Sequence, residues 1–155
     1  MTDTIRIDFP VTMRSVSLAD DLFKVIANNV ASDAKTAFNI RIVLSELFSN
    51  AFLYGDKQSG NAMIEFKGCF TKDKFVASII NDGGGFADNT IEWNTFPSLL
   101  EESGRGIKII KKLCDKLEFR KHGNNKFEAY IEISMGTREQ HVSKAGGCNG
   151  YSETV

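Results

Sequence analysis

The sequence predicts an α+β fold, a two-layer sandwich whose mixed, mainly antiparallel sheet carries its helices on one face. Segments with the two-residue period of strands and segments with the period of helices follow one another in the order strand, two helices, two strands, helix, two strands. Short polar turns separate the strands of each later pair, which indicates antiparallel hairpins. The 155 residues are enough for one domain with a single hydrophobic core.

A strand and a helix are expected to open the chain. From Thr4 to Phe9 apolar residues alternate with polar ones, and Pro10 closes the strand. Apolar residues then recur at helical spacing from Val16 to Ile26. The pairs Asn28-Asn29 and Ser32-Asp33 are typical of a break followed by the N-cap of another helix.

The second helix carries a wide apolar stripe that should face the sheet. Its residues are Ala37, Ile40, Val43, Leu44, Leu47, Phe48 and Ala51. Gly55 is expected to end the helix soon afterwards. Glu46 and Asn50 lie beside the stripe, four residues apart, so their side chains leave the helix in the same direction.

A hairpin and an irregular segment are expected next. The stretches 63–70 and 75–80 are rich in strand-forming residues, and the polar residues 71–74 predict the turn between them. Residues 87–103 lose periodicity yet contain large apolar side chains, namely Ile91, Trp93, Phe96, Leu99 and Leu100. This composition predicts either a lid or a loop folded back on to the core.

A third helix and a second hairpin complete the predicted domain, which we place at residues 1–135. The helix begins near Ile107, and the strands are expected at 117–121 and 126–134. Residues 136–155 are mainly polar and glycine-rich, and we expect them to form a flexible tail.

Charge and cysteine content narrow the class of protein. Lys and Arg total 19 against 20 Asp and Glu, so the net charge of -1 creates no overall field that would attract nucleic acid or an anionic membrane. Cys69, Cys114 and Cys148 are odd in number and lack C-x-x-C spacing, which argues against a disulfide framework and a structural zinc site. Three free thiols are therefore expected. No apolar stretch is long enough for a signal peptide or a membrane span, so we expect a cytoplasmic protein.

The first candidate motif is the pair Glu46 and Asn50. An amide carbonyl such as that of Asn50 is a hard oxygen ligand, and Mg²⁺ that keeps waters and phosphate oxygens needs little more from a protein. The carboxylate of Glu46 can take a proton from a hydroxyl or water that attacks a terminal phosphate. The alternative is an exposed polar helix face, since such pairs are common on helices.

The second candidate motif is the segment Asn81 to Gly85. Gly83, Gly84 and Gly85 let the backbone approach a ligand, although an empty turn would use the same glycines. The side chain of Asn81 or Asp82 can accept a hydrogen bond from an exocyclic amine such as that of adenine. The spacing does not tell which of the two points inward.

The third candidate motif is the segment Ser103 to Ile107, with Gly104, Arg105 and Gly106 between them. A glycine-flanked helix N-terminus offers free N–H groups and the positive end of the helix dipole to an anion such as a triphosphate. A Ser-capped helix with glycines for loop clearance is the alternative. The chain has neither a P-loop nor a complete dinucleotide fingerprint.

In this order and with these gaps, the three motifs resemble the N, G1 and G2 boxes of the ATPase superfamily that includes gyrase, histidine kinases and mismatch-repair ATPases. The chain most resembles its bacterial anti-sigma-factor serine/threonine kinases, from the first strand to about Ser134. The resemblance implies a Bergerat-type ATPase fold, ATP and Mg²⁺ as ligands, Glu46 as the catalytic carboxylate and Asn50 as the Mg²⁺ ligand. The nucleotide is expected to contact Asn50, Asn81, Asp82, Gly83, Gly85, Gly104, Arg105, Gly106 and Ile107.

Two positions depart from the family pattern. The adenine-binding Asp of the family aligns with Asn81, whose uncharged carbonyl accepts a hydrogen bond of roughly half the strength. Tyr54 stands where the family often has a His.

The resemblance implies a kinase that phosphorylates an anti-sigma-factor antagonist in a partner-switching system and that also binds a sigma factor, in a family that forms homodimers. Two alternatives stay open: an ATP-binding module that sequesters a partner without phosphotransfer, and a freestanding histidine-kinase catalytic domain. His122 in a predicted turn and His141 in the tail do not lie on a dimerising helix, so the expected phosphoacceptor is a hydroxyl of another protein. No nucleic-acid or membrane partner is expected.

Overall fold

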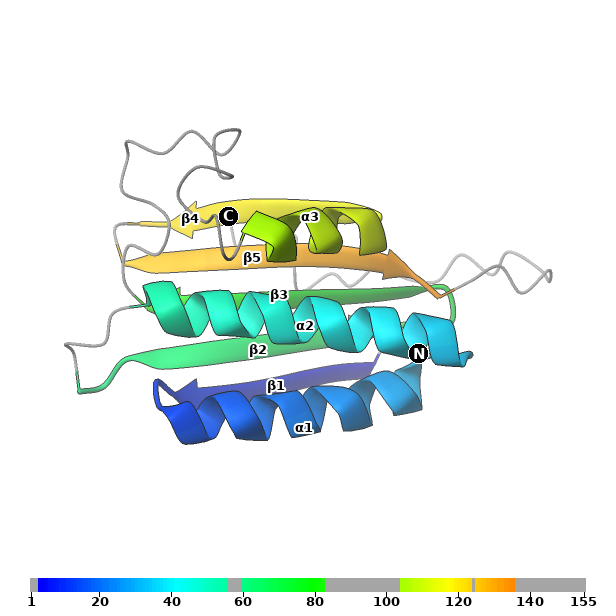
Figure 1. The fold of residues 1–155 in the computed structure, drawn as a ribbon. Helices are drawn as coiled ribbons and strands as arrows, with labels where there is room; N and C mark the ends of the chain where they lie inside the picture. The colour runs from blue at the N-terminus through cyan, green and yellow to red at the C-terminus, as the bar shows by residue number, and fades with distance from the viewer. Residues whose placement is uncertain (1–2, 56–59, 83–103, 124, 136–155) are drawn as a thin grey trace.

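The computed structural model describes residues 3–55, 60–82, 104–123 and 125–135. Their strands form one sheet in the order β1-β2-β3-β5-β4, and the helices cover one face of it (Figure 1). The elements are β1 (Asp3–Pro10), α1 (Met13–Val30), α2 (Ala34–Tyr54), β2 (Met63–Phe70), β3 (Lys74–Asp82), α3 (Gly104–Leu113), β4 (Lys116–His122) and β5 (Lys126–Ser134). The predicted fold class is confirmed. The expected mixed sheet is antiparallel at every pairing between described strands.

Side-chain caps fix where the two long helices begin. The Thr12 hydroxyl accepts a hydrogen bond from the Ser15 N–H at 3.2 Å, and the Asp33 carboxylate accepts one from the Thr36 N–H at 2.8 Å. Each cap satisfies an N–H group that the first helical turn leaves without a partner. The expected break before the Asp33 N-cap is present, but it begins two residues later than Asn28-Asn29, because α1 continues to Val30. The side-chain amide of Asn29 donates to the Val25 carbonyl at 2.7 Å.

A cluster of phenylalanine rings fixes α1 and α2 on the sheet. Phe48 of α2 meets Phe9 of β1 edge to face with ring centroids 5.0 Å apart, and it meets Phe23 of α1 at 5.8 Å. Phe23 in turn meets Phe66 of β2 at 5.2 Å. All four rings are buried, so this cluster makes α2 a firm platform for the side chains on its other surfaces.

A polar contact also joins α1 to α2. The Ser45 hydroxyl donates to the Asp20 carboxylate at 2.6 Å, and the Arg41 guanidinium lies 3.4 Å from the other carboxylate oxygen. The hydrogen bond from Ser45 lowers the pKa of Asp20, partial burial opposes this shift, and the charge of Arg41 adds to the lowering. This contact fixes the rotation of α2 at the residue next to Glu46.

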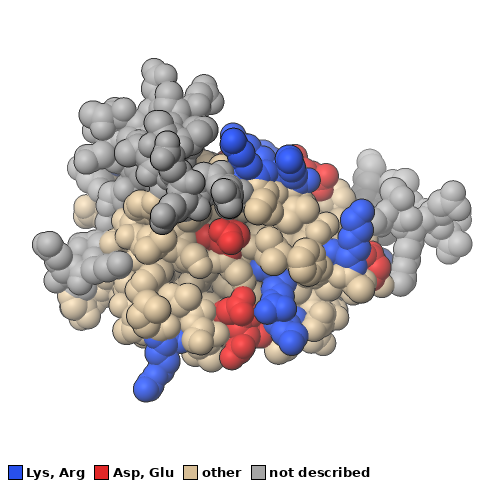
Figure 2. Space-filling view, viewed as in Figure 1, with Lys and Arg blue, Asp and Glu red and all other residues tan. Residues whose placement is uncertain are grey.

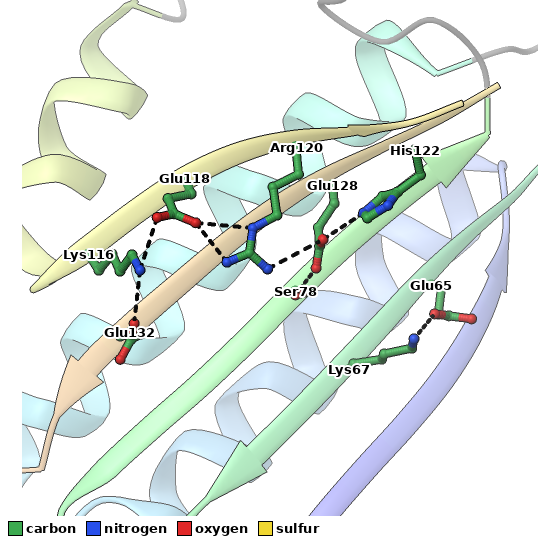
Figure 3. Close-up of polar contacts among 9 residues, drawn as sticks. All are labelled: Glu65, Lys67, Ser78, Lys116, Glu118, Arg120, His122, Glu128 and Glu132. Carbon is green, nitrogen blue, oxygen red and sulfur yellow. Dashed lines mark hydrogen bonds and ion pairs between the residues drawn. The ribbon is translucent and has the colours of Figure 1, made fainter. Parts of the chain in front are cut away.

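The face of the sheet away from the helices is polar (Figure 3). Glu128, only 1% exposed, accepts a hydrogen bond from Ser78, and one of its oxygens lies 2.8 Å from Nε2 of His122. Arg120 donates to Glu118 at 2.7 Å and lies 3.8 Å from Glu128. His122 therefore ends β4 and contacts a carboxylate, whereas the sequence placed it in a turn. With this face occupied by ion pairs, the apolar side of the sheet is the one that the helices cover.

The cysteines differ from the expectation of three free thiols. Cys69 is disulfide-bonded, so the expectation is wrong at this residue. An odd number of cysteines permits one bridge, and spacing alone does not detect it. Cys114 is free, and burial raises the pKa of its thiol to about 12.

Within the described part of the chain, no helix is both long enough and apolar enough to cross a membrane.

Candidate functional site

A small pocket lies between the C-terminal half of α2 and the strands β3, β5 and β4. It is lined by Leu47, Asn50, Ala51, Tyr54, Ile79, Asn81, Phe119, Phe127 and Ala129. These residues enclose about 10 Å³, which is room for about one water molecule. The lining is apolar except for the carboxamides of Asn50 and Asn81 and the phenol of Tyr54. None of these nine side chains is charged.

Asn50 points into this pocket from the middle of an otherwise apolar surface. Its side chain is 4% exposed, and Nδ2 has no hydrogen-bond partner among the described residues. The helix period brings Asn50 there together with Leu47 and Ala51, which belong to the buried stripe. Leaving a buried polar atom unpaired costs about 1–3 kcal/mol. A cost of this kind is expected where a side chain is kept for a ligand.

The structure decides which residue at the end of β3 faces inward. Asn81 lies on the helix side of the sheet and lines the pocket, where the one bond of its Nδ2 to a described residue is a long one of 3.3 Å to the Asp82 carbonyl. Asp82 points to the opposite face, and its carboxylate accepts a hydrogen bond from the Met63 N–H at 3.1 Å. Because β3 pairs with β5 through Asp82 and with β2 as far as Asn81, the alternation of a strand fixes these directions.

Aromatic side chains form one wall of the pocket. Asn81 of β3 pairs with Phe127 of β5, and Phe119 lies on β4, the strand on the other side of β5. The rings of Phe119 and Phe127 stack with centroids 5.7 Å apart and an angle of 19° between their planes. Neither ring is predicted as a site residue from the sequence. Alternation predicts that both face the helices, but only the strand order brings them beside Asn81.

The start of α3 is anchored on this aromatic wall. Gly104, Arg105 and Gly106 form the first turn of α3, whose N–H groups have no partner within the helix. Ile107, 5% exposed, packs against Phe127, with Tyr54 and Phe119 beside it. One side chain, Phe127, thus belongs both to the pocket and to the support of the α3 N-terminus.

Glu46 is half-buried on α2, one turn before Asn50, and it is not among the described residues that line the pocket. The structure therefore brings Asn50 and Asn81 together but leaves Glu46 beside them. Gly83, Gly85 and the expected lid at 87–103 lie outside the described residues, as does the tail at 136–155. No three His, Cys, Asp or Glu side chains converge as a metal site within the described ranges.

Charges of both signs are interspersed on the helix-covered face of the molecule. Figure 2 shows blue and red side chains separated by uncharged ones, with a group of blue residues over α3. Lys108, Lys111 and Lys112 are exposed on that helix.

Gly55 ends α2 close to the pocket, and a side chain there should disturb the end of the helix. A Cβ at Gly55 would lie 2.6 Å from the Ala51 carbonyl oxygen and 3.6 Å from Nδ2 of Asn81. We expect Gly55→Ala to lower the free energy of unfolding by about 1–3 kcal/mol, because the backbone of the last helical turn must move. Urea unfolding of the variant and the wild type would measure this change in free energy. Gly60→Ala is the matched control, since a Cβ at Gly60 has no neighbour within 4 Å. Equal losses in the two variants would contradict this reasoning.

Comparison with known proteins agrees with this fold. A family model described as a histidine kinase-like ATPase domain matches residues 9–128. No curated protein matches the sequence. Among solved structures, a chain in the crystal structure of the SiaB–SiaC complex from Pseudomonas aeruginosa has a similar fold, with a TM-score of 0.54 and 9% sequence identity. The similarity covers 84% of this chain and 89% of that chain, and at this identity it shows the fold alone.

Proposed function

The chain belongs to the histidine kinase-like ATPase domain family, and on this premise we propose that it is an ATP-dependent protein serine/threonine kinase that also acts as an anti-sigma factor. Its substrate is a hydroxyl group of an anti-sigma-factor antagonist, and its second partner is a sigma factor. The observation that carries the proposal is the pocket shared by the buried carboxamides of Asn50 and Asn81, next to the first turn of α3.

The residues at this site fit a magnesium nucleotide. Asn50 is a buried amide with an unpaired polar atom, which suits a side chain that completes its contacts on a ligand. A Mg²⁺ ion held by Asn50 would neutralise phosphate charge and take its other ligands from phosphate and water. A single amide is therefore sufficient protein chemistry, and no cluster of carboxylates is needed.

We assign the remaining roles from the resemblance and from where the described residues lie. Asn81 contacts the base, while Asp82 points to the other face of the sheet. The resemblance assigns the shaping of the pocket to Gly83 and Gly85, which lie outside the described residues, and we assign the phosphates to the N–H groups from Gly104 to Ile107. Glu46 takes the proton from the attacking hydroxyl as the new oxygen–phosphorus bond forms and the bond to the leaving diphosphate breaks.

Nucleotide binding must open the pocket, since about 10 Å³ does not admit a purine. Tyr54 and Phe119 are half-buried, whereas the other lining residues are buried. Tyr54 stands one helical turn after Asn50, where it can cover a bound nucleotide.

The partner assignments rest on the resemblance to anti-sigma-factor kinases. The solved neighbour is itself recorded in a complex of two proteins, which supports a role that depends on a protein partner. A homodimer and a cytoplasmic location belong to the same proposal.

The test uses the full chain, Mg-ATP and a candidate antagonist protein. We expect nucleotide binding that strengthens with Mg²⁺, followed by transfer of phosphate to the antagonist as an acid-stable phosphoester. Acid-labile phosphate on the target would instead indicate a histidine acceptor and the freestanding histidine-kinase reading. Absence of nucleotide binding with and without Mg²⁺ would rule out all of these functions.

A second candidate, an ATP-binding module that sequesters its partner without phosphotransfer, is favoured by one observation. The base contact is the neutral Asn81, and no charged side chain lines the described pocket. On this reading the protein binds ATP and its partner but leaves every antagonist unmodified. The same assay therefore separates the two candidates.

A further inference from the structure

We infer that the pocket accepts purine nucleotides with a 6-oxo group, such as inosine and guanosine triphosphates, about as well as ATP, because its base contact is the carboxamide of Asn81. This inference rests on the proposed nucleotide site and concerns which bases it admits. It begins from the direction of two neighbouring side chains. Asn81 lies in the pocket, whereas Asp82 is on the opposite face and accepts a hydrogen bond from Met63.

A carboxamide can match either purine edge. Adenine presents an amino donor, and a 6-oxo purine presents a carbonyl acceptor at the same position. The Asn side chain carries both an acceptor oxygen and an NH₂ donor, whereas an ionised carboxylate only accepts. A half-turn of the amide therefore exchanges the group that faces the base, and both bases find a partner.

The surroundings of Asn81 permit this half-turn. Within the described residues, the side-chain amide of Asn81 makes one hydrogen bond, in which Nδ2 donates to the Asp82 carbonyl at 3.3 Å. This distance is longer than the usual range for an N–H to O bond. The neighbouring Gly55 has no side chain that could block rotation of the amide. Even a Cβ at this position would lie 3.6 Å from Nδ2 of Asn81. The torsion that turns a carboxamide is broad and roughly two-fold, so both orientations are accessible.

The rest of the described pocket does not distinguish between the two edges. Its walls are aromatic and aliphatic, and stacking on rings such as Phe119 and Phe127 tolerates any base because every base has a π face. No charged side chain among the described lining residues favours an amino group over a carbonyl. Discrimination at the 6-position thus depends on Asn81.

Binding of ATP and inosine triphosphate to the full chain, measured by calorimetry with Mg²⁺, tests the inference. These two nucleotides differ only in the 6-position and the protonation of the adjacent ring nitrogen. We expect dissociation constants within about tenfold of each other, whereas a site built for one hydrogen-bonding pattern can discriminate by 10⁴-fold or more. Strong ATP binding with inosine triphosphate more than tenfold weaker would overturn the inference and leave the proposed function intact. Failure to bind either nucleotide would reject both.

Variants at Asn81 test whether this residue is the cause. In Asn81→Asp a carboxylate oxygen faces the 6-oxo group, and we expect the preference for ATP to rise by at least tenfold. Asn28→Asp makes the same chemical change on the exposed surface of α1 and should leave the ratio unchanged. If Asn81→Asp does not fold, Asn81→Ala serves instead, and its affinities for both nucleotides should fall together. An unaltered ratio in Asn81→Asp, or a loss of only one nucleotide in Asn81→Ala, would refute the role of Asn81.

Discussion

Replacement of Glu46 by Gln should lower the rate of phosphate transfer by about 100- to 10,000-fold while nucleotide affinity stays the same. The amide keeps the shape of the side chain but cannot take the proton of the attacking hydroxyl. Glu46 is half-buried on α2 and is not among the described residues that line the pocket. The substitution should therefore leave the contacts made by Asn50 and Asn81 in place.

Single-turnover transfer of labelled phosphate to the antagonist would measure the rate, and a separate titration would measure nucleotide binding. Glu118→Gln is the matched control, because this carboxylate lies on the opposite face of the sheet beside Arg120. A Glu46→Gln protein that transfers phosphate at the wild-type rate would remove Glu46 from the chemistry. Loss of binding together with transfer would instead indicate a structural role for the carboxylate.

Local signals in the sequence predicted the elements that carry the site. Asp33 caps α2 and Gly55 ends it, as their types and positions predict. The alternating strands and the turn at 71–74 gave the hairpin of β2 and β3 with small errors at its ends. Each of these signals acts within a few residues, which is why sequence alone is sufficient for them.

The direction of Asn81 and Asp82 needed information from outside the segment. Three glycines follow them, and this composition suggests that the strand ends before the pair. Pairing with β2 reaches Asn81 and pairing with β5 extends β3 through Asp82, and the alternation of an extended strand then points Asn81 inward. The same argument explains why Phe119 and Phe127 were not predicted as pocket residues. Their place beside Asn81 depends on β5 lying between β3 and β4.

The polar network on the far face of the sheet was also beyond prediction. Glu128 reads as an ordinary solvent-facing residue of an alternating strand, yet it is almost fully buried and contacts both Ser78 and His122. Its partners lie on two other strands, β3 and β4. A sequence pattern reports which face a residue occupies, but the charges that meet there depend on the register between strands.

Replacement of Asn50 by Leu should stabilise the free protein and abolish magnesium-dependent nucleotide binding. Nδ2 of Asn50 is buried without a hydrogen-bond partner among the described residues, a condition that costs about 1–3 kcal/mol. Leu has a similar shape, and it would meet Leu47, Ala51 and Ile79 in the same pocket. In the absence of ligand, we expect the free energy of unfolding of Asn50→Leu to exceed that of the wild type by about 1–3 kcal/mol.

Mg-ATP should reverse this order of stability, because a ligand at about 1,000 times its dissociation constant stabilises a folded protein by about 4.1 kcal/mol, more than the advantage expected for Asn50→Leu. The wild type gains this increment, and Asn50→Leu does not. Urea unfolding with and without Mg-ATP measures both effects, and Asn28→Leu on the exposed surface of α1 controls for the change of side chain. A ligand-free Asn50→Leu protein less stable than the wild type would mean that the amide supports the fold. If Asn50 is kept only for ligand binding, the ligand-free Asn50→Leu protein should be more stable than the wild type, since a residue kept for binding need not contribute to folding.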